Sequence, residues 1–253
     1  MPAENDLYAE YRRLRDAYFA SRGVAIDNRS NGLRASYYVF AQNLKESVAL
    51  LDYFESINGI SDLWPLERRP RRRRFYDEVG RRLHNVIAAA KSLADHCRNT
   101  ARALYAESEF LTRYQTKIEE TSDKSPVSRF VGDLRNYILH YRGSPIVGRV
   151  GTHGADIVLD RQRLLEWDGW KFLSRSFLND SPEKISVRAA LTEYRQIVTA
   201  FYDWLYEEQV LIHKKDFEES DALYDRLIEL ERLMEEKETN SGGELSTGKT
   251  AKK

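Results

Sequence analysis

One short stretch of the sequence combines side chains that could act together on a phosphodiester. It reads GDLRNYILHYR and covers residues 132–142. On an α-helix, which turns about 100° per residue, Asn136 and His140 lie one turn apart on the same face. Arg135 lies about 140° from His140, but its long side chain can reach round the helix toward that face. The stretch can therefore present an imidazole, an amide and a guanidinium to one ligand.

Each of these three groups has a chemical use at a phosphodiester. Arg can donate two parallel hydrogen bonds to phosphate oxygens. His can transfer a proton near neutral pH, and Asn can hold the imidazole ring or a scissile oxygen in register. The alternative is that Arg and His are solvated on a helix surface and that Asn bonds locally to the backbone.

The stretch also resembles the signature of the HEPN superfamily, a group of all-helical domains. That signature is Arg, a polar residue, a few mostly apolar residues and then His, and here it reads RNYILH at residues 135–140. The resemblance extends to RRLHNVIAAAKSLADHCR (Arg81 to Arg98) and IVTAFYDWLY (Ile197 to Tyr206), which are similar to standalone bacterial HEPN proteins.

The resemblance implies a metal-independent endoribonuclease that acts as a homodimer, with motifs from two subunits meeting in one cleft. In such enzymes the RNA 2′-hydroxyl attacks the adjacent phosphate, which leaves a 2′,3′-cyclic phosphate and a 5′-hydroxyl. Carried onto this chain, His140 would be the acid/base, Arg135 the phosphate clamp and Asn136 the orienting residue. No cofactor or metal is implied. A role as a toxin or an anti-phage defence effector, with an antitoxin or regulatory protein as a further partner, is implied as well.

Two other functions compete with the nuclease. Some HEPN proteins have lost activity, so the chain could be a non-catalytic helical module that binds a nucleotide, RNA or a protein partner. It could also be a structural helical scaffold in which the motif is coincidental. The intact Arg-Asn-His trio favours the enzyme.

A run of arginines, which Pro70 alone interrupts, is the second basic feature. It consists of Arg68, Arg69, Arg71, Arg72, Arg73 and Arg74. Guanidinium groups clustered at the start of a helix are typical of contacts to a nucleic-acid backbone, which give salt-dependent affinity without sequence preference. We expect RNA to bind here. The alternatives are a solvated face or ion pairs with the acidic segment 216–238.

The composition limits the class of protein. The 253 residues include 40 Lys+Arg and 40 Asp+Glu, so the formal net charge is zero, and 42% are hydrophobic. These values exclude wholesale disorder and a uniformly basic nucleic-acid coat protein. The single cysteine, Cys97, excludes a disulfide framework and a Cys-based zinc site. Because no apolar stretch reaches 18 residues and the N-terminus lacks an apolar signal core, we expect a soluble cytoplasmic protein without a membrane partner.

Apolar residues recur at helical spacing along most of the chain, which predicts a mostly α fold arranged as a HEPN-like antiparallel bundle. Helices are expected at residues 5–21, 33–56, 71–105, 108–120, 126–142 and 186–212. Gly23 is expected to close the first of them, and residues 60–70 and 121–125 are expected to be irregular connections.

The remaining segments complete the expected organisation. Two short β-type runs around a Gly-Thr-His-Gly sequence predict a β-hairpin at about residues 146–160. We expect a helical domain at residues 1–215 that includes this hairpin. An acidic helical extension follows at 216–238, and a disordered tail at 239–253.

Overall fold

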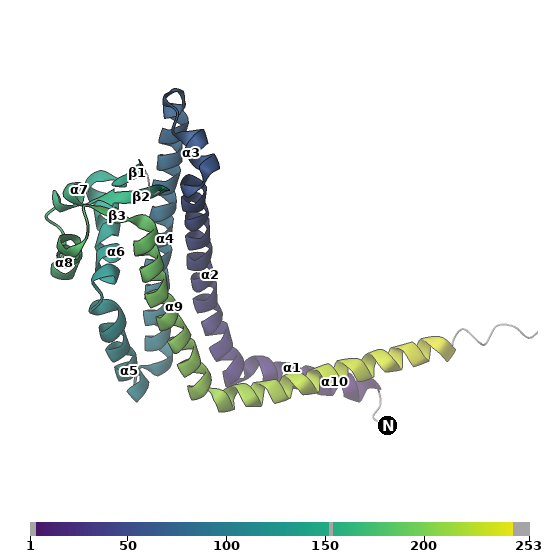
Figure 1. The fold of residues 1–253 in the computed structure, drawn as a ribbon. Coiled ribbons are helices and arrows are strands. Elements are labelled where there is room, and N and C mark those ends of the chain that lie inside the picture. Colours follow the sequence, from purple (N-terminus) through teal and green to yellow (C-terminus); the bar gives the residue numbers. More distant parts are fainter. Residues whose placement is uncertain (1–3, 152–153, 245–253) are drawn as a thin grey trace, which may run out of the picture. The chain divides into compact units, whose positions relative to one another are not determined.

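The chain is mostly helical and carries one small antiparallel sheet (Figure 1). The structure is a computed structural model, and it describes residues 4–151 and 154–244. Contacts within the chain divide it into a smaller unit, Met1–Asn31 with Glu207–Lys253, and a larger unit, Gly32–Tyr206. The predicted fold class, mostly α with an inserted hairpin, is confirmed at this level. Within the described ranges, no helix is both long and apolar enough to cross a bilayer.

Ten α-helices occur in the described residues. They are α1 Glu4–Ala20, α2 Arg22–Glu55, α3 Ile57–Leu63, α4 Arg69–Tyr105, α5 Glu109–Ile118, α6 Pro126–Tyr137, α7 Arg161–Leu165, α8 Phe172–Asp180, α9 Val187–Ile212 and α10 Lys214–Glu244. A 3₁₀ turn covers Leu66–Arg68, and two π turns cover Glu119–Asp123 and Ile138–Arg142. The strands are β1 Ile146–Gly151, β2 Gly154–Asp160 and β3 Lys184–Ser186.

The prediction that Gly23 closes the first helix is wrong. Helix α2 begins at Arg22, so Gly23 lies inside it. A Cβ at this position would lie 2.2 Å from the Ser220 hydroxyl oxygen and 2.4 Å from the Asp216 backbone oxygen, both on α10. The glycine therefore permits a close approach of two helices within the smaller unit, where a side chain would collide with backbone.

Both connections predicted to be irregular contain helical turns. Helix α3 and the 3₁₀ turn occupy most of residues 57–68, and the Ser56 hydroxyl caps α3 by accepting the Gly59 N–H at 3.0 Å. The first π turn covers three of the five residues expected to form the 121–125 loop. Helix α8 and strand β3 have no counterpart in the sequence prediction.

The smaller unit is formed by α1 and α10 packing together. Leu7 of α1 is buried, as are Leu227 and Leu230 of α10, and the Tyr11 hydroxyl donates to Glu231 at 2.7 Å. The predicted domain boundary at 215 lies inside this unit, because α1 packs on the segment predicted to be a separate extension. Helix α10 continues through Glu244, so part of the tail predicted to begin at 239 is helical. Residues 245–253 lie outside the described residues.

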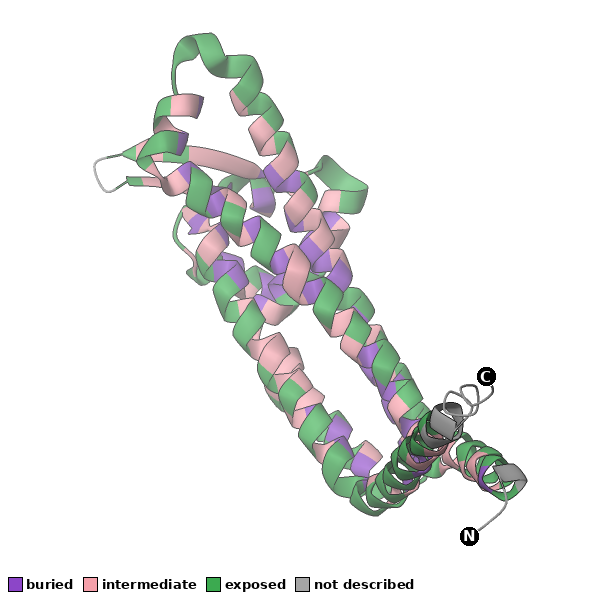
Figure 2. Cartoon of the chain, turned by 90° about the vertical axis from the view of Figure 1, so that its right-hand side faces the viewer, coloured by how far each residue is buried: buried purple, intermediate pink, exposed green. Residues whose placement is uncertain are grey.

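The larger unit holds the main core, which forms where α2 (from Gly32), α4, α5, α6 and α9 (to Tyr206) pack together. Buried residues follow one side of its long helices and exposed residues the other (Figure 2). Aromatic pairs join the helices: Tyr37 of α2 stacks on Tyr202 of α9 at 4.0 Å, and Phe110 of α5 stacks on Trp204 of α9 at 5.8 Å. This pattern is the one that amphipathic spacing predicts.

The predicted hairpin is present directly after the motif segment. Strand β1 pairs antiparallel with β2, with Val147 opposite Val158, and β2 pairs antiparallel with β3. The central strand is buried at Ile157, Val158 and Leu159. The two turn residues, Thr152 and His153, lie outside the described residues.

One buried carboxylate links helix α6 to helix α8. Asp133 is 5% exposed, and its Oδ2 accepts the Ser174 hydroxyl at 2.7 Å and the Lys171 backbone N–H at 3.2 Å. Lys171 is the residue before α8, so the carboxylate holds the start of that helix on α6. Phe130 of α6 stacks on Phe177 of α8 at 4.6 Å beside this contact. Together these contacts fix which side of α6 faces inward.

We expect Asp133→Ala to destabilise the larger unit by about 1–3 kcal/mol, because it leaves the buried Ser174 hydroxyl without an acceptor and also removes the acceptor of the Lys171 N–H. Asp133→Asn retains one acceptor oxygen and should cost less. Urea unfolding followed by circular dichroism measures the difference. Asp168→Ala is the matched control, since Asp168 is exposed and should change stability by less than about 0.5 kcal/mol. Equal effects of Asp133→Ala and Asp168→Ala would contradict the assignment.

Candidate functional site

The three motif side chains lie where α6 changes into a π turn. Arg135 and Asn136 belong to the last turn of α6 and are half-buried, whereas His140 lies in the π turn and is exposed. None of the three side chains makes a hydrogen bond or ion pair with any other part of the described chain. Their polar groups are therefore available to a ligand.

The π turn changes the geometry that the sequence predicts for this segment. A π turn bonds residues five apart, one more than an α-helix, so the chain rotates less per residue. Part of the interval between Arg135 and His140 lies in this wider turn. The two side chains are consequently separated by less than the roughly 140° expected for a regular helix. Gly143, at φ 63°, then ends the helix, and π turns of this kind are frequent at functional sites.

Aromatic packing holds the π turn in place. The Tyr141 ring lies 5.3 Å from the Tyr137 ring and 6.3 Å from the Trp167 ring, and Arg142 forms an ion pair with Glu166. Tyr137 is buried, and burial raises the pKa of its phenol. The turn that carries His140 is thus anchored by its neighbours on both sides.

A hollow of about 520 Å³ lies between α4 and the segment after the motif. Arg73, Tyr76 and His84 line it from α4, and Ile138 and Ser144 line it from the other side. Arg73 and His84 make no hydrogen bond or ion pair within the described ranges, and the buried Ser144 hydroxyl also has no partner there. Burial raises the pKa of Tyr76, so its phenol stays neutral. The hollow therefore presents polar groups next to the turn that carries His140.

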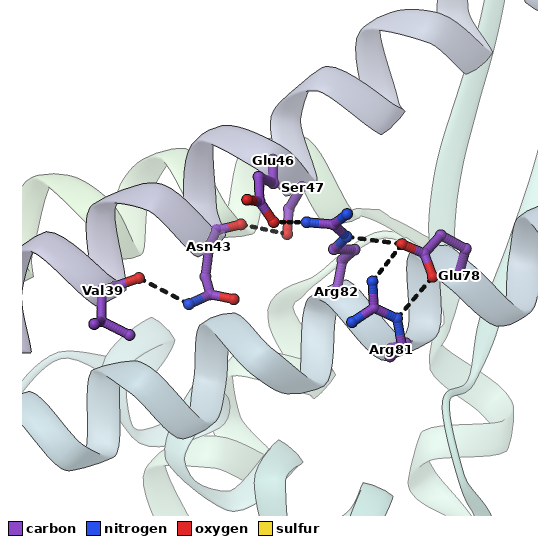
Figure 3. Close-up of polar contacts among 7 residues, drawn as sticks. All are labelled: Val39, Asn43, Glu46, Ser47, Glu78, Arg81 and Arg82. Atoms are coloured by element: carbon purple, nitrogen blue, oxygen red, sulfur yellow. Dashed lines mark hydrogen bonds and ion pairs between the residues drawn. The ribbon is translucent and has the colours of Figure 1, made fainter.

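Two neighbouring arginines of α4 bind carboxylates within the fold. Arg81 donates to both oxygens of Glu78, and Arg82 donates to Glu78 at 2.8 Å and forms an ion pair with Glu46 of α2 (Figure 3). The hydrogen bond from Arg81 lowers the pKa of the Glu78 carboxyl, which keeps this cluster ionised. These contacts join α4 to α2.

Half of the predicted arginine run also binds groups within the fold. Arg68 and Arg71 form ion pairs with Asp62 of α3, the second at 2.7 Å. Arg72 donates to the Trp64 backbone oxygen at 2.9 Å and lies 5.5 Å from the centre of its ring. The pKa of Asp62 is lowered, first by a hydrogen bond from the Tyr53 hydroxyl and then by Arg71 and Arg68. The three arginines therefore hold the start of α4 against α3.

The other half of the run is free. Arg69, Arg73 and Arg74 are exposed and have no hydrogen-bond or ion-pair partner among the described residues. Of these three, Arg73 lines the hollow beside the motif segment, and Arg69 and Arg74 do not. Arg135, Asn136 and His140 do not line this hollow, so the structure places one predicted RNA-binding arginine beside the motif segment but not against the predicted catalytic side chains.

Sequence reasoning missed this hollow, although one signal of it was present. Arg73 and His84 are eleven residues apart, which is three helical turns, so they share a stripe of α4. Ser144 gave no such signal, because its burial depends on the path of the chain after Gly143. In the described part of the chain, no three His, Cys, Asp or Glu side chains cluster where they could hold a metal ion.

Comparisons of the chain with models of protein families, with curated proteins and with solved structures find no match. The resemblance to the HEPN superfamily therefore depends on residues 135–140 and on the two longer stretches alone, and the function has to be argued from the chemistry of the site.

Proposed function

We propose that the chain is a metal-independent endoribonuclease of the HEPN type that acts as a homodimer. The observation that carries the proposal is the state of Arg135, Asn136 and His140. All three project from one short segment at a π turn, and none of them has a partner within the described chain. By contrast, Asp133 on the same helix is fully engaged. Free, pre-positioned donors and an exposed imidazole suit a ligand that accepts hydrogen bonds and exchanges protons.

The proposed reaction is transfer within the RNA backbone. The 2′-hydroxyl oxygen forms a bond to the adjacent phosphorus, and the bond from phosphorus to the 5′-oxygen breaks. His140 takes the proton from the 2′-hydroxyl, and the imidazole of a second copy donates a proton to the leaving 5′-oxygen. Arg135 holds the phosphate oxygens, where charge increases in the transition state, and Asn136 orients the imidazole or the scissile oxygen.

Two features support a second copy at this surface. One chain supplies one His140, whereas the reaction requires a base and an acid. The flanking residues Leu139 and Tyr141 each leave 43% of their surface exposed. A second copy that brought its own motif to the cleft would cover this apolar surface.

The hollow beside the π turn offers a path for the neighbouring nucleotides. Arg73 and His84 could contact backbone phosphates there, and the Ser144 hydroxyl would gain the partner that it lacks. Such contacts position RNA without reading its sequence.

We expect His140→Ala to reduce cleavage by at least about 10²–10⁴-fold, the usual contribution of a general acid or base. Arg135→Ala should cost about 10²–10³-fold, as for the loss of one preorganised contact to an anionic transition state. Activity should persist in EDTA, products should carry 2′,3′-cyclic phosphates, and 2′-deoxy substitution at the scissile nucleotide should block the reaction. Gel assays with end-labelled RNA and mass spectrometry of the products measure all five outcomes.

The matched control is His96→Ala, which removes another imidazole from the larger unit, one that lies 2.7 Å from the Ser36 hydroxyl. It should leave cleavage unchanged. Cleavage that is lost in EDTA, or that proceeds on the 2′-deoxy substrate, would refute the proposed chemistry. RNA or nucleotide binding without cleavage, lost in both motif variants, would favour the non-catalytic module instead.

The arginine run should separate into two classes by experiment. We expect Arg69→Gln, Arg73→Gln and Arg74→Gln together to weaken RNA binding for all sequences alike and to reduce the slope of log affinity against log salt by about 2, since each lost phosphate contact removes about 0.7 on a single strand. Fluorescence anisotropy at several salt concentrations measures this slope.

The matched variant replaces Arg68, Arg71 and Arg72 by Gln. Because these side chains bond to Asp62 and Trp64, this variant should lower the thermal midpoint and change the salt slope less than the first variant does. If the first variant binds RNA as the unmodified chain does, the free arginines are a solvated face and not an RNA contact.

A further inference from the structure

A second, smaller cavity lies in the larger unit and is lined by residues of α4, α5, α6 and α9. Its volume is about 190 Å³. It reaches α6 at Ser128 and Arg129, seven residues before Arg135, which corresponds to about 10 Å along the helix. None of the three motif side chains lines it, so it is separate from the proposed nuclease site.

The walls of this cavity are apolar and aromatic. Leu93, Cys97 and Tyr114 are each no more than 3% exposed, and the Tyr114 ring meets the Phe201 ring edge-to-face at 5.7 Å. Burial raises the pKa of the Cys97 thiol to about 12, so this wall carries no charge at neutral pH. Ala90 also lines the cavity, and its small side chain leaves the interior unfilled.

One polar group inside the cavity lacks a partner. The Ser128 hydroxyl is buried and makes no hydrogen bond within the described chain, although the Ser128 backbone N–H is capped by the Ser125 hydroxyl at 3.2 Å. Buried hydroxyls are almost always paired, because an unpaired one loses its bonds to water without replacement. The hydroxyl is therefore placed to bond a molecule that enters the cavity.

The charges at the rim are already paired. Arg129 lies 3.5 Å from Asp123, and Arg98 lies 2.8 Å from Asp95. Arg98 shares Asp95 with Lys91, which lies 2.7 Å from the same carboxylate, so each guanidinium at the rim has a carboxylate partner and neither is left unpaired. A neutral ligand fits this electrostatic balance better than an anion or a cation.

We propose that this cavity binds a small neutral aromatic molecule with one hydroxyl group, of the size and chemistry of phenol. The ring lies among Leu93, Tyr114 and Phe201, and the hydroxyl bonds to Ser128. The volume is sufficient, since an apolar cavity of about 150 Å³ admits benzene. Apolar and aromatic walls with a small number of polar groups are the usual composition of a small-molecule site.

Amide NMR titrations of the full chain with phenol and with toluene test the proposal. The two probes have nearly the same shape, but only phenol can bond to Ser128. We expect phenol to shift the amide signals of residues that line the cavity, with an affinity about tenfold above that of toluene. Ser128→Ala should reduce the affinity for phenol to that for toluene.

A blocking variant gives an independent readout. Ala94 is an exposed residue that lines the cavity, so Ala94→Phe should close the entrance without disturbing the core and abolish binding of both probes. Asn99→Phe, at an exposed position of the same helix that does not line the cavity, should leave binding unchanged. The proposal is overturned if phenol causes no shifts at up to about 10 mM. Shifts that persist in both Ser128→Ala and Ala94→Phe would overturn it equally.

Discussion

The arrangement of both sites depends on the burial of one face of α6. Phe130 and Tyr137 pack on aromatic rings from the segment around α8, and Asp133 accepts two hydrogen bonds from the start of that helix. A buried carboxylate with two donors is satisfied in only one rotational setting of the helix, because any other setting leaves it unpaired in an apolar surrounding. With the inward face fixed in this way, Arg135, Asn136 and His140 must project from the remaining sides. The polar interaction thus sets the orientation, and the aromatic burial supplies most of the stabilisation.

Most helices could be predicted from the sequence because burial follows the helical period. In α4 the apolar residues from Leu83 to Ala101 are largely buried, and helix α9 begins one residue from its predicted start. The features that sequence reasoning missed depend on contacts between distant segments. Strand β3 has only three residues and exists because β2 offers it an edge. Glycine is common at helix ends, but Gly23 lies inside α2, where the close approach of α10 leaves no space for a side chain. No local sequence pattern indicates this approach.

The sequence indicates the residue types of the candidate site, but it does not indicate whether their side chains are free to contact a ligand. The spacing of Arg135, Asn136 and His140 indicates a common surface, and the structure adds that these side chains have no partner within the described chain. In the arginine run, three side chains have partners within the described part of the fold and three do not. Arg68, Arg71 and Arg72 bond to α3 and the segment after it, whereas Arg69, Arg73 and Arg74 remain free. The sequence of the run does not indicate which arginines have partners, because the pairing depends on where Asp62 and Trp64 lie in space.

The two π turns lie on either side of α6, and this placement has a physical reason. A π turn packs its backbone less favourably than an α-helix, so it persists only where tertiary contacts hold it. In the middle of α6 the buried face leaves no room for a wider turn, and the helix is regular from Pro126 to Tyr137. Outside this region the chain departs from α geometry, at Glu119–Asp123 beside the small cavity and at Ile138–Arg142 beside the larger hollow. The side chains of Ser128 and His140, which have no partner within the described chain, lie near the first and the second π turn respectively. One rigid helix therefore connects the two sites, and each site occurs where the core stops constraining the backbone.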